Sequence, residues 1–228
     1  MINESEKIPM SIRASGPAPN LKISEWVQGG PTNLDAHRGK VVLVEVFQVN
    51  CPGCFLYGLP EAIEVYTKYR HDNLVAIGLS TAFEDFDKNN LENLKKLMSS
   101  GEVVGETLNT LQKHDWLNGN QLRYKIPFPV AMDNLVSREA EHVDQKVIKI
   151  IEHEIPQFER LSYGEQMRIR NRIRDYVLHQ EFTAETFEEY AMNGTPTSLL
   201  IDKKGILRYK LFGTTGKLDK LVKQLLGE

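Results

Sequence analysis

The chain has 228 residues, of which 41% are hydrophobic and 26% charged, and its formal net charge is −3. This is the composition of an ordinary globular protein, and the slight acidic excess argues against bulk binding to nucleic acid or to an anionic membrane. Residues 1–10 lack the apolar core of a secretory signal peptide, and no segment approaches the ~20 apolar residues of a membrane span. We therefore expect a cytoplasmic protein that binds neither membrane nor nucleic acid.

The predicted elements begin after a polar segment, residues 1–15, which we expect to be flexible. The rest of the chain, 16–228, is long enough for one domain with a central sheet. An early strand is predicted over 21–26, and turn structure over 33–40. Val41–Phe47 is apolar and β-branched apart from one acid, which is typical of a strand buried on both faces of an α/β sheet.

A helix is predicted directly after Cys54 and extends to about Tyr69, because apolar side chains recur at helical spacing. Pro60 lies inside this helix and should kink it. The next buried strand, 74–79, follows at the spacing of a parallel strand–helix–strand unit. Three further elements are predicted in the middle of the chain: helices over 91–98 and 103–112, and a short strand over 128–132 that ends at Asp133.

The pattern changes between about residues 135 and 189, where two helices carry an apolar stripe of their own. The sequence from Ser162 to Glu165 is typical of a capping box that opens the second of them. We interpret this region as a helical insertion in the domain. The C-terminal section predicts strands over 198–202 and 206–211 joined by a turn at Gly205, and a closing helix with apolar residues at 218, 221, 222 and 225.

The only two cysteines of the chain lie in one tetrapeptide, Cys51-Pro52-Gly53-Cys54. At the beginning of a helix this spacing places both sulfur atoms on one face, where they can form a reversible disulfide. The helix dipole and the free N–H groups of the first turn favour the thiolate of Cys51, and Pro52 suits that turn. We therefore predict that Cys51 is the nucleophile and Cys54 the resolving thiol of a disulfide exchange.

Glu45 interrupts the apolar strand six positions before Cys51. A carboxylate in a strand that is buried on both faces should have a raised pKa, which makes it a candidate proton acceptor for Cys54. The alternative is an acid at the end of the strand that faces water or pairs with Lys40 or Arg38.

Several short segments occur in the order found in one known family: Gly16–Pro19, Gly39–Phe47, Cys51–Cys54, Gly194–Thr197, Leu199–Asp202 and Gly205. Together they resemble the thioredoxin-fold redoxins of the TlpA/ResA-like group. The resemblance implies a thioredoxin-like α/β fold, in which a central mixed β-sheet is flanked by helices, with activity on disulfides. The helical insertion would stand before the strand that follows the family's cis-proline.

The resemblance also implies roles for individual residues. Glu45 falls where thioredoxins carry a buried aspartate. Pro196 matches the cis-proline, which lies against the cysteine pair and binds the substrate backbone together with Thr195. Asn50 replaces the tryptophan that usually precedes the first cysteine, and so removes an apolar platform for partners. We expect substrate contacts from five residues of these loops: Asn50, Pro52, Gly53, Thr195 and Pro196.

The leading interpretation is a thiol–disulfide oxidoreductase that works as a reductase. Its substrate would be a protein or small-molecule disulfide, and its electron donor a thiol that the sequence does not identify. No cofactor is expected, since the cysteine pair itself carries the electrons. No metal is expected either, because two cysteines without a nearby histidine fall short of the about four ligands of a zinc site.

Two alternatives belong to other classes of protein. A thiol peroxidase shares this fold, but Val44 and Gln48 stand where peroxiredoxins carry the proline and the threonine of their cysteine motif. A non-enzymatic redox sensor or metal-binding module, docked to a partner through the insertion, also agrees with the sequence. For the insertion itself four roles stay open: a lid, a partner-docking element, a dimer surface, or a simple cover for the sheet edge.

Overall fold

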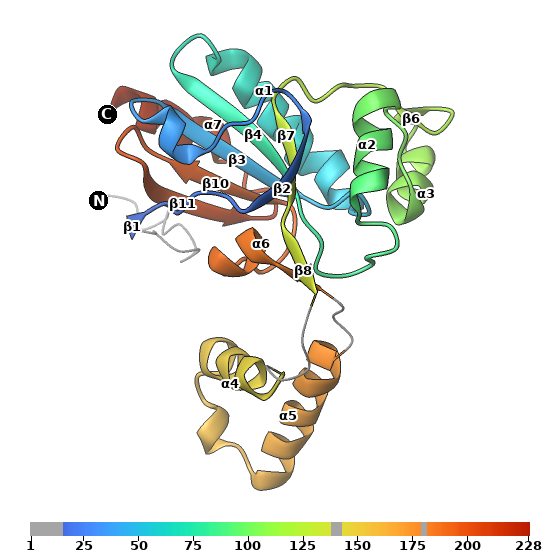
Figure 1. The fold of residues 1–228 in the computed structure, drawn as a ribbon, viewed down its shortest axis with the longest axis vertical. Coiled ribbons are helices and arrows are strands. Elements are labelled where there is room, and N and C mark those ends of the chain that lie inside the picture. Colours follow the sequence, from blue (N-terminus) through green and yellow to red (C-terminus); the bar gives the residue numbers. More distant parts are fainter. Residues whose placement is uncertain (1–15, 138–142, 179–181) are drawn as a thin grey trace, which may run out of the picture.

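The fold is built around one mixed β-sheet, shown in Figure 1. The computed structural model describes residues 16–137, 143–178 and 182–228, and the segment 1–15 lies outside these ranges. In spatial order the strands are β1 (Gly16–Pro17), β11 (Ile206–Phe212), β10 (Thr197–Ile201), β3 (Val41–Phe47), β4 (Leu74–Ser80), β7 (Val130–Asp133) and β2 (Ile23–Gln28). β3, β4 and β7 run parallel, and the remaining strands are antiparallel to their neighbours.

β3 lies in the middle of this sheet, and all seven of its residues are buried. Its alternate residues feed two separate cores: Val41, Leu43 and Phe47 on one face of the sheet, and Val42, Val44 and Val46 on the other. Side chains alternate along a strand, so Glu45 points to the first of these faces. The parallel register of β3 and β4 confirms the predicted strand–helix–strand unit.

Helices cover both faces of the sheet. The face with Leu43 and Phe47 packs against α1 (Leu59–Tyr69) and α7 (Leu218–Gly227), with α2 (Leu91–Ser100), α3 (Gly105–Lys113) and the short strands β5 (Leu117–Asn118) and β6 (Gln121–Leu122) beside them. A 3-10 helix (Leu34–His37) and α6 (Glu185–Glu189) lie on the other face. The β10–β11 hairpin and the closing helix α7 confirm the predictions for the C-terminal section.

The helix predicted after Cys54 is present, but its first full turn is a π-helix, Cys54–Gly58. The N–H of Leu59 donates to the carbonyl of Cys54, five residues earlier. Pro60 has no N–H to donate and stands at the start of α1, where none is needed. The distortion expected inside the helix is therefore taken up by a wider turn just before the proline, next to the cysteine pair.

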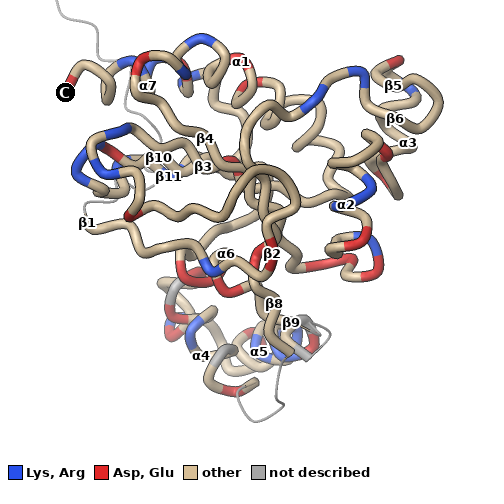
Figure 2. Tube along the Cα trace, turned by 45° about the horizontal axis from the view of Figure 1, so that its top comes forward, with Lys and Arg blue, Asp and Glu red and all other residues tan. Residues whose placement is uncertain are grey.

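The insertion forms a helical hairpin of α4 (Val143–Glu154), a 3-10 turn (Phe158–Arg160) and α5 (Tyr163–Leu178). Figures 1 and 2 both show it below the sheet, beyond a two-stranded ribbon of β8 (Leu135–Ser137) and β9 (Phe182–Ala184). It has a small core of its own, made of Val143, Val147, Ile151, Phe158 and Val177. At the start of α5 the Glu165 carboxylate accepts the N–H of Ser162 at 3.0 Å, as the capping-box pattern predicts.

Asp133, which is buried at the end of β7 just before the insertion, binds the chain where it returns from the insertion. Its carboxylate accepts the backbone N–H groups of Thr186 (2.9 Å) and Phe187 (3.1 Å) and the hydroxyl of Thr81 (2.9 Å). These bonds fix the first turn of α6 against the sheet. Residues 182–189, the last part of the predicted insertion, therefore pack on the main body.

Figure 2 shows Lys and Arg interspersed with Asp and Glu over most elements, in keeping with the small net charge. Among the described residues, no helix has the length and apolar character to cross a membrane.

Candidate active site

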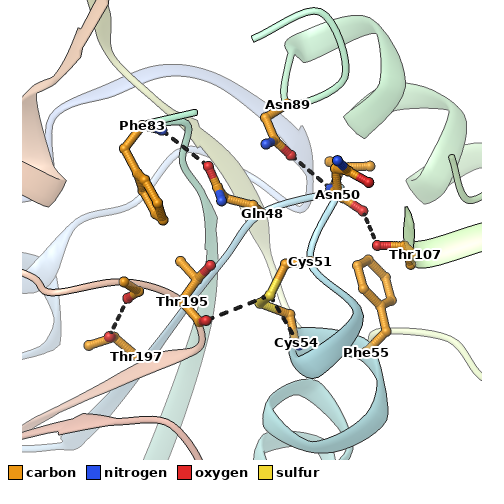
Figure 3. Close-up of a disulfide and its surroundings, with 12 residues drawn as sticks. Gln48, Asn50, Cys51, Cys54, Phe55, Phe83, Asn89, Thr107, Thr195 and Thr197 are labelled. Carbon is orange, nitrogen blue, oxygen red and sulfur yellow. Dashed lines mark hydrogen bonds between the residues drawn. A yellow bond between two sulfur atoms is a disulfide. The ribbon is translucent and has the colours of Figure 1, made fainter. Parts of the chain in front are cut away.

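Cys51 and Cys54 form a disulfide at the point where the chain leaves β3 and turns into the helix (Figure 3). Their Cα atoms are 5.3 Å apart, in the usual range for such a bond. Cys54 is fully buried, whereas Cys51 is only partly buried. An incoming thiol or disulfide therefore meets the sulfur of Cys51 first.

Two backbone groups surround the sulfur atom of Cys51. The N–H of Cys54 points to it at 3.2 Å, within the first helical turn. The carbonyl oxygen of Thr195 lies 3.7 Å away on the other side, as Figure 3 shows. When the disulfide is reduced, the N–H and the helix dipole both stabilise a negative charge on this sulfur.

The Thr195 carbonyl belongs to a loop that ends in a cis peptide bond between Thr195 and Pro196. The loop is held at both ends, because the hydroxyl of Thr197 donates to the Gly194 carbonyl at 2.7 Å and the N–H of Gly213 donates to the Pro196 carbonyl at 2.9 Å. A Cβ atom at Gly53 would lie 4.0 Å from the Pro196 ring, so the loop packs against the cysteine turn. The structure thus brings Thr195, Pro196 and Gly53 together.

Glu45 lies beneath this turn and is 1% exposed. Its Oε2 accepts the hydroxyl of Ser198 at 2.6 Å, whereas Oε1 has no hydrogen-bond partner among the described residues. Burial raises the pKa of Glu45 to about 8, against the opposing effect of the Ser198 hydrogen bond. The alternative of an acid paired with Lys40 or Arg38 is wrong: Lys40 is exposed, and Arg38 donates to the carbonyl of Lys204.

Gly58 lies between Glu45 and the cis-proline, on the helix that begins at the cysteine turn. A Cβ atom on Gly58 would lie 2.5 Å from Pro196 Cβ and 2.6 Å from Glu45 Oε1. Gly58 follows Cys54 by four residues, so the two lie on the same side of the helix. The unpaired oxygen of Glu45 therefore faces the underside of the turn that carries the resolving cysteine.

Two solved structures of similar chains support the same architecture. A thioredoxin-like superfamily protein aligns with a TM-score of 0.57 and 26% identity, over 94% of this chain and 98% of its own. A thiol-disulfide isomerase from Corynebacterium glutamicum aligns with the same TM-score and identity, over 93% and 97% of the two chains. The fold is thioredoxin-like. Because this fold carries the Cys51–Cys54 disulfide at a helix N-terminus, the protein is an oxidoreductase. No protein-family model and no curated protein sequence matches the chain.

Replacing Gly58 by alanine tests how tightly this thioredoxin-like site is packed. Alanine normally stabilises a helix over glycine by up to about 1 kcal/mol. Here the added methyl group meets Pro196 and Glu45, and we expect a net loss of about 1–2 kcal/mol in the free energy of unfolding by urea. Gly164→Ala is the matched control, since nothing lies within 4 Å of the new methyl group in α5. Equal stabilisation by both substitutions would contradict the packing.

Two further polar residues hold the thioredoxin-like core around the pair. Gln48 is buried just after β3, and its Oε1 accepts the N–H of Phe83 at 3.1 Å. The side chain at the position of the peroxiredoxin threonine therefore makes a hydrogen bond within the protein. Tyr124 donates to the carbonyl of Phe55 at 2.8 Å, and burial raises the pKa of its hydroxyl. Among residues 16–137, 143–178 and 182–228, no cluster of three or more His, Cys, Asp or Glu is arranged to hold a metal ion.

Sequence reasoning missed Ser198 and Gly58 as partners of Glu45. Ser198 stands opposite Glu45 in the register of β10 and β3, which depends on a pairing between strands 153 positions apart in the chain. A glycine within a predicted helix was a visible signal for Gly58, because such a residue often marks a close approach. Asn50 directly precedes the cysteine turn, and its contact with a substrate stays a prediction.

Proposed function

We propose that the protein is a thiol–disulfide oxidoreductase that reduces disulfides through Cys51 and Cys54. The observation that carries the proposal is the disulfide itself, which presents one accessible sulfur at a helix N-terminus beside the Thr195–Pro196 loop. The substrate is a protein or small-molecule disulfide, and the donor that restores the dithiol is itself a thiol.

In the first half-reaction the Cys51 thiolate attacks one sulfur of the substrate. The substrate S–S bond breaks, a mixed disulfide to Cys51 forms, and the departing substrate thiolate takes a proton from water. The N–H of Cys54, 3.2 Å from Cys51 Sγ, stabilises the attacking thiolate. The Thr195–Pro196 loop stands beside the sulfur, where it can align the substrate backbone.

In the second half-reaction Cys54 must lose its proton before it attacks Cys51 Sγ. Glu45, with a pKa near 8, is ionised in part of the molecules at neutral pH and can take this proton from below. The new S–S bond between Cys51 and Cys54 expels the second substrate thiol and gives the oxidised state seen in the structure. Two electrons have then passed from the cysteine pair to the substrate.

The proposal includes membership of the TlpA/ResA-like group and a cytoplasmic location. The Gly16–Pro19 entry and the Gly194–Thr197 loop support the group. The location is supported by the presence of only two cysteines, both in the redox pair, because a reducing compartment keeps such a pair supplied with thiols. One of the similar solved structures is that of a thiol-disulfide isomerase, which agrees with this chemistry.

The proposal is tested by following reduction of insulin disulfides by dithiothreitol, with and without the protein. We expect clear acceleration, while consumption of hydrogen peroxide under the same conditions stays at the uncatalysed rate. Rapid peroxide consumption without insulin reduction would instead identify a thiol peroxidase. Absence of both activities in protein shown to cycle between dithiol and disulfide would point to a sensor.

A further inference from the structure

Asn50, the residue directly before Cys51, is held by three hydrogen bonds to distant parts of the chain, of which Figure 3 shows the one to Asn89. Its backbone N–H donates to Asn89 Oδ1 at 2.7 Å, and its Nδ2 donates to Asp85 Oδ2 at 2.8 Å. Its Oδ1 accepts the backbone N–H of Glu106, in the first turn of α3, at 2.7 Å. Both polar atoms of the side-chain amide are therefore engaged within the protein.

Two of these partners, Asp85 and Asn89, belong to the loop 83–90. This loop packs against residues 182–187, where the chain returns from the insertion. The rings of Phe83 and Phe187 stack with centroids 4.6 Å apart, and Phe86 meets Phe182 edge-on at 5.4 Å. A loop fixed by two aromatic contacts is a firm anchor for the residue that it binds. The position of Asn50 thus depends on α3, on this loop and on the returning chain.

We propose that Asn50 is a positioning residue for Cys51, and that it does not contact the substrate. The inference rests on the thiol–disulfide function proposed above. By fixing the backbone before Cys51, the three bonds keep Cys51 Sγ at 3.2 Å from the N–H of Cys54, the donor that stabilises the thiolate. A looser turn would weaken this charge-assisted hydrogen bond, and the Cys51 thiol would ionise at higher pH.

Gly105 gives a second way to disturb Asn50 without removing a polar group. It begins α3 with a φ of +58°, and a Cβ atom there would collide with the Asn50 Oδ1 that accepts the Glu106 N–H. The close approach of the two residues explains why a side chain is absent at this position. Gly105→Ala should therefore push the Asn50 amide out of place.

The chain offers a matched control for each substitution. Asn33 resembles Asn50 in being partly buried and in making three hydrogen bonds, two to the backbone of Leu21 and one to that of Leu34, before the opposite end of β3. Gly119 has a φ of +65° and open space around its Cα, so Gly119→Ala imposes similar backbone strain without a collision.

The experiment measures alkylation of Cys51 by iodoacetamide as a function of pH, in a Cys54→Ser background where Cys51 is the only thiol. We expect Asn50→Ala and Gly105→Ala to move the midpoint up by about one pH unit, which slows alkylation about tenfold below the midpoint. Asn33→Ala and Gly119→Ala should leave the midpoint at the value of the background protein. None of the four substitutions changes the charged groups near the turn, namely Asp85 and Lys88 of the loop, Glu106 of α3 and Glu45 beneath.

A second measurement separates positioning from substrate contact. With both cysteines present, Asn50→Ala should lower kcat/KM for a small aromatic disulfide mainly through kcat, in step with the lost thiolate. A raised KM with an unchanged alkylation midpoint would overturn the proposal, and so would equal midpoints in all variants. Gly105→Ala decides the matter if Asn50→Ala fails to fold. Alkylation needs no disulfide exchange, so failure of the proposed function would be seen separately, as an inactive wild-type protein.

Discussion

Replacing Cys51 by serine is expected to lower disulfide exchange by at least about a thousandfold, whereas Cys54→Ser should stop the reaction half-way. A serine hydroxyl is not ionised near neutral pH and cannot attack a disulfide. Cys54 cannot take over, because it is fully buried behind Cys51. In Cys54→Ser the first half-reaction is intact, so a mixed disulfide with the substrate should accumulate.

The two variants are incubated with insulin whose disulfides are intact. The products are then compared by non-reducing electrophoresis and by mass spectrometry of the intact adduct. We expect an adduct on Cys51 in Cys54→Ser that dithiothreitol removes, and none in Cys51→Ser. The reverse pattern, an adduct only in Cys51→Ser, would exchange the roles assigned to the two sulfur atoms. Thermal or urea unfolding of both variants excludes loss of the fold as the cause.

Glu45→Gln is expected to stabilise the folded protein in alkaline solution and at the same time to slow its catalysis. Burial raises the pKa of Glu45 from 4.5 to about 8 in the folded protein. Between these two values the folded state holds one proton more than the unfolded state, so the free energy of unfolding falls as the pH rises. At 1.36 kcal/mol per unit, the wild type should lose about 5 kcal/mol between pH 4.5 and 8 through this group.

The glutamine side chain keeps the shape of Glu45 but carries no charge, so this contribution to the pH dependence should vanish. Urea unfolding at a series of pH values measures it: the two proteins should be similar near pH 4.5 and differ most above pH 8. Ser198→Ala is the companion variant. It removes the hydrogen bond that favours the carboxylate, and should move the fall in stability to higher pH. Parallel curves for wild type and Glu45→Gln would exclude a buried, titrating Glu45.

The kinetic consequence of Glu45→Gln concerns the second half-reaction alone. If Glu45 accepts the proton of Cys54, the mixed disulfide should form at the normal rate and resolve about 10–100-fold more slowly around pH 7–8. Rapid mixing with a chromogenic disulfide resolves the two phases. Unchanged resolution over the range pH 5–9 would remove Glu45 from the mechanism.

Much of the fold could be predicted because its signals are local. The run Val41–Phe47 identified the central strand, since a strand covered on both faces needs apolar residues throughout. The Gly205 turn identified the hairpin, and the apolar spacing after Leu218 identified the closing helix. The cysteine pair could be placed at a helix tip because its residues are contiguous and the helix follows at once.

The parts that could not be predicted depend on contacts between distant residues. The partners of Asn50 lie 35 to 56 positions further along the chain, so nothing near Asn50 in the sequence indicates that its amide is engaged. Ser198 reaches Glu45 only through strand pairing. The π-turn before Pro60 is a third case: the proline indicates a disturbed helix, but it does not indicate whether the helix kinks or widens.

The β8–β9 ribbon has a consequence for how this chain can change in evolution. Because β8 and β9 are paired, the two ends of the insertion stay about 5 Å apart, whatever its length. The helical hairpin can therefore be shortened, lengthened or exchanged for a tight turn while the register of the main sheet and the placement of α6 are preserved. Its apolar stripe packs into the hairpin's own small core, so the hairpin is a separate packing unit from the core of the main sheet.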